Sequence, residues 1–162
     1  MTEKSPVNRI PKLKAVVFDV DGVFTHDQSR HVFSVRDTMA IRTMRKAGYK
    51  IGVLTTTRSL EIRTHVEFVG IDAFSVSADK SRALAEMLSK FGVDSNEACF
   101  VSRDRNDIEL IRGVGFGVAL VTSDQETQQA ARFVTSKPGG DGAIFEICNL
   151  ILTHKNIREM QL

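Results

Sequence analysis

The sequence contains no run of apolar residues long enough to cross a membrane, which excludes a membrane-spanning protein. Net charge is small, because 22 lysines and arginines face 20 aspartates and glutamates, and the basic residues are spread along the chain. That distribution argues against a dedicated nucleic-acid surface. The polar segment 1–14 contains Pro6 and Pro11 and lacks the apolar core of a signal peptide. We therefore expect a cytoplasmic protein that binds neither nucleic acid nor membrane.

Cysteine is also rare. Cys99 and Cys148 each lie in an apolar run and show no pairing pattern, so we expect two buried free thiols in a reducing compartment. The sequence has no internal repeat, no low-complexity tract and no interdomain linker. A Walker-type loop and a dinucleotide-binding fingerprint are likewise absent, which leaves little support for nucleotide binding without hydrolysis.

What is present is the composition of an ordinary soluble domain, with 42% hydrophobic and 26% charged residues. A chain of 162 residues has the length of one domain and can bury a substantial core. We expect that domain to span residues 13–153, with a flexible leader over 1–12 and a polar tail over 154–162.

Short apolar segments alternate along the chain with segments of helical period. The predicted strands are 15–20, 51–54, 73–77, 98–101, 117–121 and 134–136. The predicted helices are 38–47, 59–70, 80–91, 108–112, 124–132 and 143–153, with Asp37 and Asp79 as N-caps. The polar segment 25–36, with His26 and His31, is expected to form a hairpin or loop. This alternation indicates an α/β fold, a doubly wound, Rossmann-like parallel sheet between two layers of helices.

The first predicted strand leads directly into Asp19, Asp21 and Gly22. Two carboxylates at the end of a buried strand are costly unless positive charge meets them. The carboxyl ends of parallel strands are also where open α/β sheets place their sites. One Asp there can attack an electrophile while a nearby metal ion screens its charge. The alternative is a simple turn in which an Asp caps the next element.

Later strand ends carry further polar side chains. Thr55, Thr56 and Thr57 precede a helix N-terminus, an arrangement that suits a phosphate group but also ordinary helix capping. Lys80 lies in the first turn of the third helix, where it opposes the helix dipole. Such a lysine can hold a phosphate or pair with an Asp, although alone it is typical of a solvated surface. Residues 102–107 add a second group of acids, with two arginines among them.

Together these residues resemble the four motifs of the haloacid dehalogenase (HAD) superfamily of phosphotransferases, over about residues 13–152. Within it, the chain is most similar to the small, capless phosphatases of eight- and nine-carbon sugar acids. KDO 8-phosphate phosphatase is their best-known member, and the C-terminal module of some CMP-sialic acid synthetases is related. The closer similarity is carried by residues 21–25 (Asp-Gly-Val-Phe-Thr), 33–37 (Phe-Ser-Val-Arg-Asp), 79–80 (Asp-Lys) and 139–143 (Gly-Gly-Asp-Gly-Ala).

The resemblance implies a specific chemistry. Asp19 would be the nucleophile that forms an aspartyl-phosphate, Asp21 the general acid and base, and Lys80 a catalytic cation. The implied substrate-binding residues are Thr55, Thr56, Lys80, Arg36 and Gly140. The implied ligands of a Mg²⁺ cofactor are Asp19, Asp21 (through its backbone carbonyl), Asp104 and Asp107. Physical chemistry agrees, because a carboxylate attacks a phosphate dianion only where positive charge neutralises both.

The sequence departs from the family pattern at four places. Arg103 stands where the family has the metal-ligating Asp of its fourth motif, and a guanidinium cannot ligate a cation. It could instead take the place of the cation and pair with Asp19. The second motif loses its Gly, and its Arg is shifted or lost. The hairpin after Thr25 is short. Asp141 replaces an Arg linked with substrate recognition in KDO 8-phosphate phosphatases.

Two functions are compatible with this pattern. The first is a Mg²⁺-dependent phosphatase that hydrolyses a small phosphorylated sugar acid of the KDO or sialic acid type through Asp19. The second is a catalytically impaired pseudo-phosphatase that acts as an oligomerisation or regulatory module, and it is motivated by Arg103. The resemblance also implies a homotetramer in which a neighbouring subunit's hairpin and C-terminal segment close each site.

Overall fold

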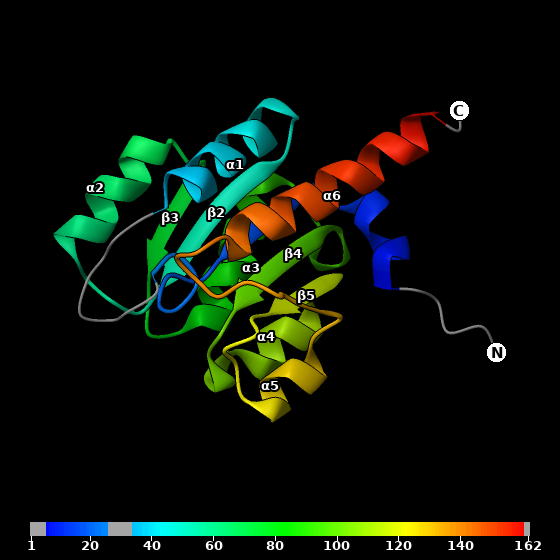
Figure 1. Ribbon diagram of the computed structural model, residues 1–162. Coiled ribbons are helices and arrows are strands. Elements are labelled where there is room, and N and C mark those ends of the chain that lie inside the picture. Colours follow the sequence, from blue (N-terminus) through cyan, green and yellow to red (C-terminus); the bar gives the residue numbers. More distant parts are fainter. Residues whose placement is uncertain (1–5, 26–33, 161–162) are drawn as a thin grey trace.

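Six parallel strands form a single sheet in the computed structural model, which describes residues 6–25 and 34–160 (Figure 1). The order across the sheet is β3-β2-β1-β4-β5-β6, so the chain reverses its direction of travel between β1 and β4. The predicted α/β class is confirmed. The strands are β1 (Ala15–Phe18), β2 (Lys50–Thr55), β3 (Ala73–Val76), β4 (Ala98–Ser102), β5 (Phe116–Ala119) and β6 (Phe133–Val134).

Helices cover both faces of this sheet. The α-helices are α1 (Val35–Lys46), α2 (Leu60–Val69), α3 (Lys80–Phe91), α4 (Ile108–Gly113), α5 (Gln125–Ala130) and α6 (Ala143–Met160), and the short 3₁₀ turns are η1 (Pro6–Lys12), η2 (Ser95–Glu97) and η3 (Arg105–Asp107). Figure 1 shows α1 and α6 crossing one face, and α3 and α4 pack against the other. Among the described helices, none is long and apolar enough to cross a bilayer.

Side chains alternate along β1 between two separate cores. Val16 and Phe18 pack with residues of α1, α2 and α6, whereas Ala15 and Val17 pack with residues of α3 and α4. Successive residues of a strand point to opposite faces, and both faces of this sheet are covered. The central strands are therefore apolar throughout, which explains why their sequence reads as short uninterrupted hydrophobic runs.

The start of α1 differs from the prediction. Its N-cap is Ser34, whose hydroxyl accepts a hydrogen bond from the N–H of Asp37 at 3.3 Å. The prediction of Asp37 as N-cap is wrong, because this buried carboxylate instead accepts the N–H of Phe145 near the start of α6 at 3.0 Å. The N-cap at Asp79 is confirmed by its bond from the N–H of Arg82. The predicted loop with His26 and His31 lies outside the described residues.

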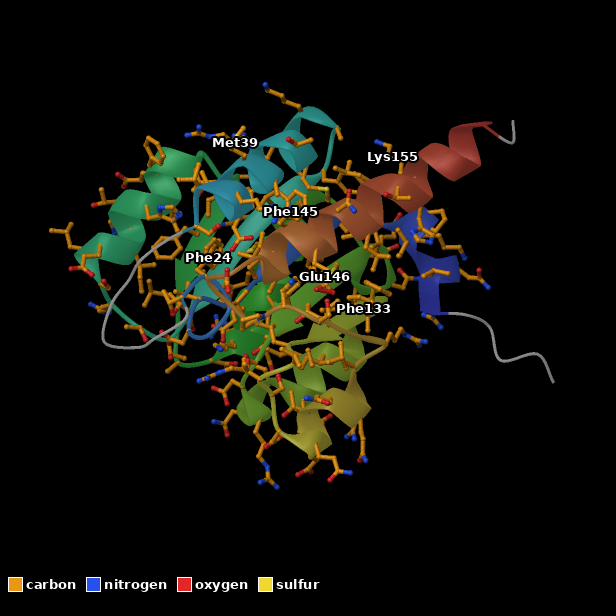
Figure 2. The ribbon with its side chains drawn as sticks, in the orientation of Figure 1. Phe24, Met39, Phe133, Phe145, Glu146 and Lys155 are labelled. Atoms are coloured by element: carbon orange, nitrogen blue, oxygen red, sulfur yellow. The ribbon has the colours of Figure 1, made fainter. Side chains whose placement is uncertain are left out.

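The two ends of the domain also differ from the prediction. Residues 6–12 were expected in a flexible leader, yet they form η1, and the side chain of Ile10 within it is completely buried against the α1–α6 layer. Helix α6 continues to Met160 instead of ending at residue 153. Figure 2 labels Lys155 on this extension; its ammonium donates to the carbonyl of Ala47 at 2.7 Å and lies 4.9 Å from the ring of Tyr49.

The prediction of two buried free thiols is confirmed. Cys99 on β4 and Cys148 on α6 are both buried and unpaired. Burial raises the pKa of each thiol well above its ordinary value, and the neighbouring Cys148 adds to the rise at Cys99. Both side chains therefore stay protonated and act as small apolar groups of the core.

Replacing Ile10 with Ala tests whether η1 belongs to the core. The change removes a completely buried side chain, so we expect the free energy of unfolding to fall by about 2–5 kcal/mol in a urea titration. Arg9→Ala, on the exposed side of the same turn, is the matched control and should change it by less than about 0.5 kcal/mol. Equal, small effects of the two variants would show that η1 does not pack on the domain.

Candidate active site

Polar side chains gather where three neighbouring strands end. Asp19 directly follows β1, Thr55 ends β2 and Ser102 ends β4, and all three are buried. The N–H of Asp19 donates to the carbonyl of Val101 at 2.9 Å, which continues the pairing of β1 with β4. The strand order reverses between these two strands, and in open parallel sheets a crevice forms at such a point.

Lys80 is the positive charge at this crevice. Asp79 caps α3 and places Lys80 at its first helical position, pointing back toward the strand ends. Its ammonium lies 3.1 Å from Oδ1 of Asp19 and 2.8 Å from Oδ2 of Asp107, and only 11% of its side chain is exposed. The structure thus brings three of the predicted site residues together in one buried ionic cluster.

Ser102 is a member of this cluster that the sequence reasoning did not single out. Its hydroxyl donates to Oδ2 of Asp107 at 2.7 Å and lies 3.4 Å from Oδ2 of Asp19. The hydroxyl oxygen of Ser102 also accepts a hydrogen bond from the N–H of Asp104 at 3.0 Å. Ser102 is the last residue of β4, the strand next to β1. This position could have identified it as a site residue, because the ends of neighbouring parallel strands face the same crevice.

Burial and the ion pairs shift the titration of both central groups. Burial raises the pKa of Asp19 from 3.8 to about 6; Lys80 opposes the rise, and Asp107 adds to it. Burial alone lowers the pKa of Lys80, but Asp19 and Asp107 outweigh it and hold this pKa above its ordinary value. At neutral pH the cluster therefore holds an ionised but poorly solvated carboxylate beside a firmly protonated lysine, which suits a nucleophile and its counter-ion.

The second acid, Asp21, is held apart from this cluster. Its Oδ2 accepts a hydrogen bond from the hydroxyl of Thr57 at 3.0 Å, and the N–H of Thr57 donates to the hydroxyl of Thr55 at 3.0 Å. Thr57 thereby connects the end of β2 to Asp21, a role that was not predicted. Thr56, between them, is exposed. The half-buried Asp21 is thus oriented for proton transfer without being neutralised by Lys80.

The glycine-rich loop lies directly against the loop that carries Asp21. A Cβ added at Gly139 would come within 1.8 Å of the carbonyl oxygen of Gly22 and 2.9 Å of the Cα of Val23. The N–H of Gly140 donates to the carbonyl of Val23 at 3.1 Å. The predicted residue Gly140 therefore lies beside the site. Its partner in that prediction, Arg36, instead stacks over the ring of Phe145, 3.9 Å from its centroid.

The described residues do not fit a divalent metal site. Asp19 and Asp107 both face Lys80, and Asp21 turns to a threonine hydroxyl. Asp104 is exposed and caps η3. Over residues 6–25 and 34–160, no three His, Cys, Asp or Glu side chains gather closely enough to hold a metal ion. Lys80 is thus shared by Asp19 and Asp107, and Asp104 caps η3 instead of joining them, while the backbone carbonyl of Asp21 stays a predicted ligand.

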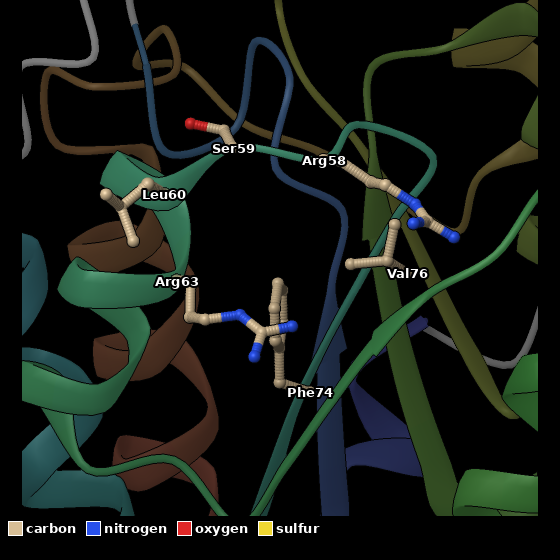
Figure 3. A pocket seen from close by; sticks show the side chains of 6 residues that line it. All are labelled: Arg58, Ser59, Leu60, Arg63, Phe74 and Val76. Atoms are coloured by element: carbon tan, nitrogen blue, oxygen red, sulfur yellow. The ribbon is translucent and has the colours of Figure 1, made fainter.

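Two hollows open beside the crevice. One, of about 410 Å³, is lined by Thr56, Lys80, Asp104 and Asp107, among others. The other, of about 560 Å³, lies between the start of α2 and strand β3 (Figure 3). Its lining combines two arginines and a serine with three apolar side chains, namely Arg58, Ser59, Leu60, Arg63, Phe74 and Val76. The first hollow thus holds Lys80 among four acids, which are Asp79, Asp104, Asp107 and Glu109, whereas the charged side chains of the second hollow are Arg58 and Arg63.

Comparison with known proteins agrees with this site. The haloacid dehalogenase-like hydrolase family matches residues 63–147, just over half of the chain. The 3-deoxy-D-manno-octulosonate (KDO) 8-phosphate phosphatase of Haemophilus influenzae is 26% identical over 153 residues, which cover 89% of this chain and 85% of that protein. These matches confirm the predicted resemblance to the superfamily and to its KDO 8-phosphate phosphatase-like members.

Two solved structures share the fold over most of their length. The cobalt-bound KDO 8-phosphate phosphatase of Haemophilus influenzae is 25% identical, with a TM-score of 0.86 over 91% of this chain and 92% of its own. The KDO 8-phosphate phosphatase of Moraxella catarrhalis, in complex with magnesium, phosphate and KDO, is 24% identical. Its TM-score is 0.88, and the match covers 93% of this chain and 92% of its own. Divalent metal ions are thus bound in these neighbours of the fold.

The raised pKa of Asp19 can be measured directly. In protein labelled with ¹³C at aspartate carboxyl carbons, the resonance that disappears in Asp19→Asn should titrate with a midpoint of about 6. Asp72 is the internal reference, because the N–H of Ile51 and Arg45 outweigh burial and hold its pKa below 3.8. A midpoint for Asp19 close to that of Asp72 would contradict the expectation.

Since the folded-state pKa of Asp19 exceeds the unfolded one, the contribution of Asp19 to stability falls as pH rises from about 4 to about 6.

The close packing of the two loops gives a second test. Gly139→Ala places a methyl group against the backbone of Gly22, so we expect the free energy of unfolding to fall by about 1–3 kcal/mol in urea. Gly113→Ala is the control, since a Cβ there meets no atom within 4 Å, and it should cost nothing or stabilise slightly. Indistinguishable effects at the two positions would mean that the loops do not touch.

Proposed function

Because the chain belongs to the haloacid dehalogenase-like hydrolase family, we propose that it is a phosphatase that hydrolyses a small phosphorylated sugar acid of the KDO or sialic acid type. The observation that carries this proposal is the buried Asp19 held 3.1 Å from the ammonium of Lys80 at the ends of the central strands. The Haemophilus influenzae relative reported above is a KDO 8-phosphate phosphatase, and it gives no support to the pseudo-phosphatase alternative.

The first step forms a covalent phosphoenzyme. A carboxylate oxygen of Asp19 attacks phosphorus, and the bond from phosphorus to the sugar oxygen breaks. The departing oxygen takes a proton from Asp21, so the sugar acid leaves as an alcohol. Lys80 balances the charge of Asp19 and of the phosphoryl oxygens in this desolvated crevice, where such an interaction is stronger than in water.

The second step restores the enzyme. A water molecule attacks the phosphorus of the aspartyl-phosphate and gives its proton to Asp21, which the first step left ionised. The bond from phosphorus to the Asp19 oxygen breaks, and inorganic phosphate departs. The hydrogen bond from Thr57 holds Asp21 in one orientation through both proton transfers. The same residue thus acts as acid and then as base, with no net consumption.

The hollows suggest how the substrate is held. The phosphoryl group must lie against Asp19, beside the ammonium of Lys80 and the buried Thr55. The carboxylate of a sugar acid suits the neighbouring hollow, where Arg58 and Arg63 offer positive charge and apolar side chains can cover the carbon chain. Roles of Arg36 and Gly140 in binding stay predictions, as does the tetramer.

Phosphate release from a substrate panel tests the proposal. The panel contains KDO 8-phosphate, a nine-carbon sialic acid phosphate and a sugar phosphate without a carboxylate. We expect release from the sugar acids, and Asp19→Asn should reduce it by a factor of about 10³ or more. Asp94→Asn is the control, because this exposed acid precedes η2 and β4, at the opposite (amino-terminal) ends of the strands, and Asn also caps well. Silence across the panel, or release that persists in Asp19→Asn, would overturn the proposal.

A further inference from the structure

Arg103 directly follows β4, and its side chain lies against the loop that follows Asp21. A Cβ built on Gly22 would come within 2.4 Å of its Nε, 2.7 Å of its Cδ and 2.8 Å of its Cζ, so the guanidinium packs directly on this glycine. Gly22 has a φ of +75°, which also favours glycine there. The head group of Arg103 is therefore located at the rim of the crevice, one residue beyond Asp21.

The guanidinium of Arg103 has no polar partner in the part of the chain that the structure describes. Arg103 is half-buried, and within the described ranges it forms no hydrogen bond and no ion pair, not even with Asp19. Its neighbour Arg105 is exposed yet pairs with Glu126, and Lys80 is shared between two carboxylates. A partly desolvated cation with free N–H donors is costly unless an anion meets it. Arg103 thus has the properties of a binding group that awaits an anionic ligand.

The charges of the crevice show which ligand it would meet. Asp19, Asp21 and Asp107 outnumber Lys80, and a phosphoryl dianion would bring further negative charge into the same space. Such a group binds there only if more positive charge is supplied. The described carboxylates do not converge on a metal ion, whereas the guanidinium of Arg103 lies against the loop that carries Asp21 and has no polar partner among the described residues.

We propose that the guanidinium of Arg103 binds the phosphoryl oxygens of the substrate and takes the place of a divalent metal, so that hydrolysis requires none. The inference rests on the proposed phosphatase function for its catalytic part. Arg103 contributes hydrogen bonds and charge only, and the bonds made and broken at phosphorus remain those of the two steps above. A guanidinium is always protonated, and its planar donors match two phosphate oxygens at once.

Calorimetry without substrate provides a test that is independent of turnover. In buffer with EDTA, inorganic phosphate should bind the wild type, and Arg103→Ala should weaken binding at least tenfold. Arg103→Lys should bind phosphate more tightly than Arg103→Ala but less tightly than the wild type, because lysine keeps the charge but lacks the planar pair of guanidinium donors. Arg105→Ala is the matched control and should bind phosphate like the wild type. Unchanged affinity in both Arg103 variants would overturn the inference.

The metal itself gives the complementary result. MgCl₂ alone should produce no binding to the wild type, and phosphate release should survive exhaustive treatment with EDTA. Arg103→Asp, with its fold checked by circular dichroism, should lose metal-free phosphate binding and gain measurable binding of Mg²⁺. Magnesium binding to the wild type, or release abolished by EDTA, would overturn the inference while leaving the phosphatase intact. Arg103-dependent phosphate binding without release from any substrate would overturn the phosphatase and leave this binding role standing.

Discussion

The ion pair of Lys80 with Asp19 is the interaction on which the rest of the site depends. A carboxylate at the end of a buried strand is expensive, and a nucleophile cannot be surrounded by solvent that would hydrate it fully. Lys80 reduces this cost from the start of α3, and Asp107 fixes the lysine from the other side. Three elements far apart in the sequence must therefore meet within about one hydrogen-bond length, which the order of the parallel sheet makes possible.

Contacts around Asp21 complete the site. Asp21 is oriented by Thr57 from the neighbouring strand end, and the loop that carries it is packed between the glycine-rich loop and Arg103. The site thus has two chemically distinct halves. One half is a buried cluster in which Asp19 and Asp107 share Lys80. The other half is a rim of donors and acids whose positive member, Arg103, has no polar partner within the described residues.

Much of this arrangement could be predicted from the sequence. Apolar runs of strand length located β1, β2 and β4, and their polar ends located Asp19, Thr55 and Lys80 near one edge, because parallel strands share the direction of their carboxyl ends. What could not be predicted depends on contacts between distant segments. Asp37 looked like a helix cap but bonds to α6, and Ile10 looked like part of a leader but is buried under it.

The hydrogen-bond and packing partners of individual side chains could not be predicted from the sequence either. Nothing in the local pattern shows that Ser102 donates to Asp107, that Thr57 holds Asp21, or that Arg103 packs on a glycine instead of pairing with an acid.

The contact of Gly139 with the carbonyl of Gly22 has a mechanical consequence of its own. Because no side chain separates the two backbones, the loop before α6 cannot shift toward Gly22 without displacing the loop that carries Asp21. The position of Asp21 is therefore coupled, through Gly22 and Gly139, to the segment that leads into α6.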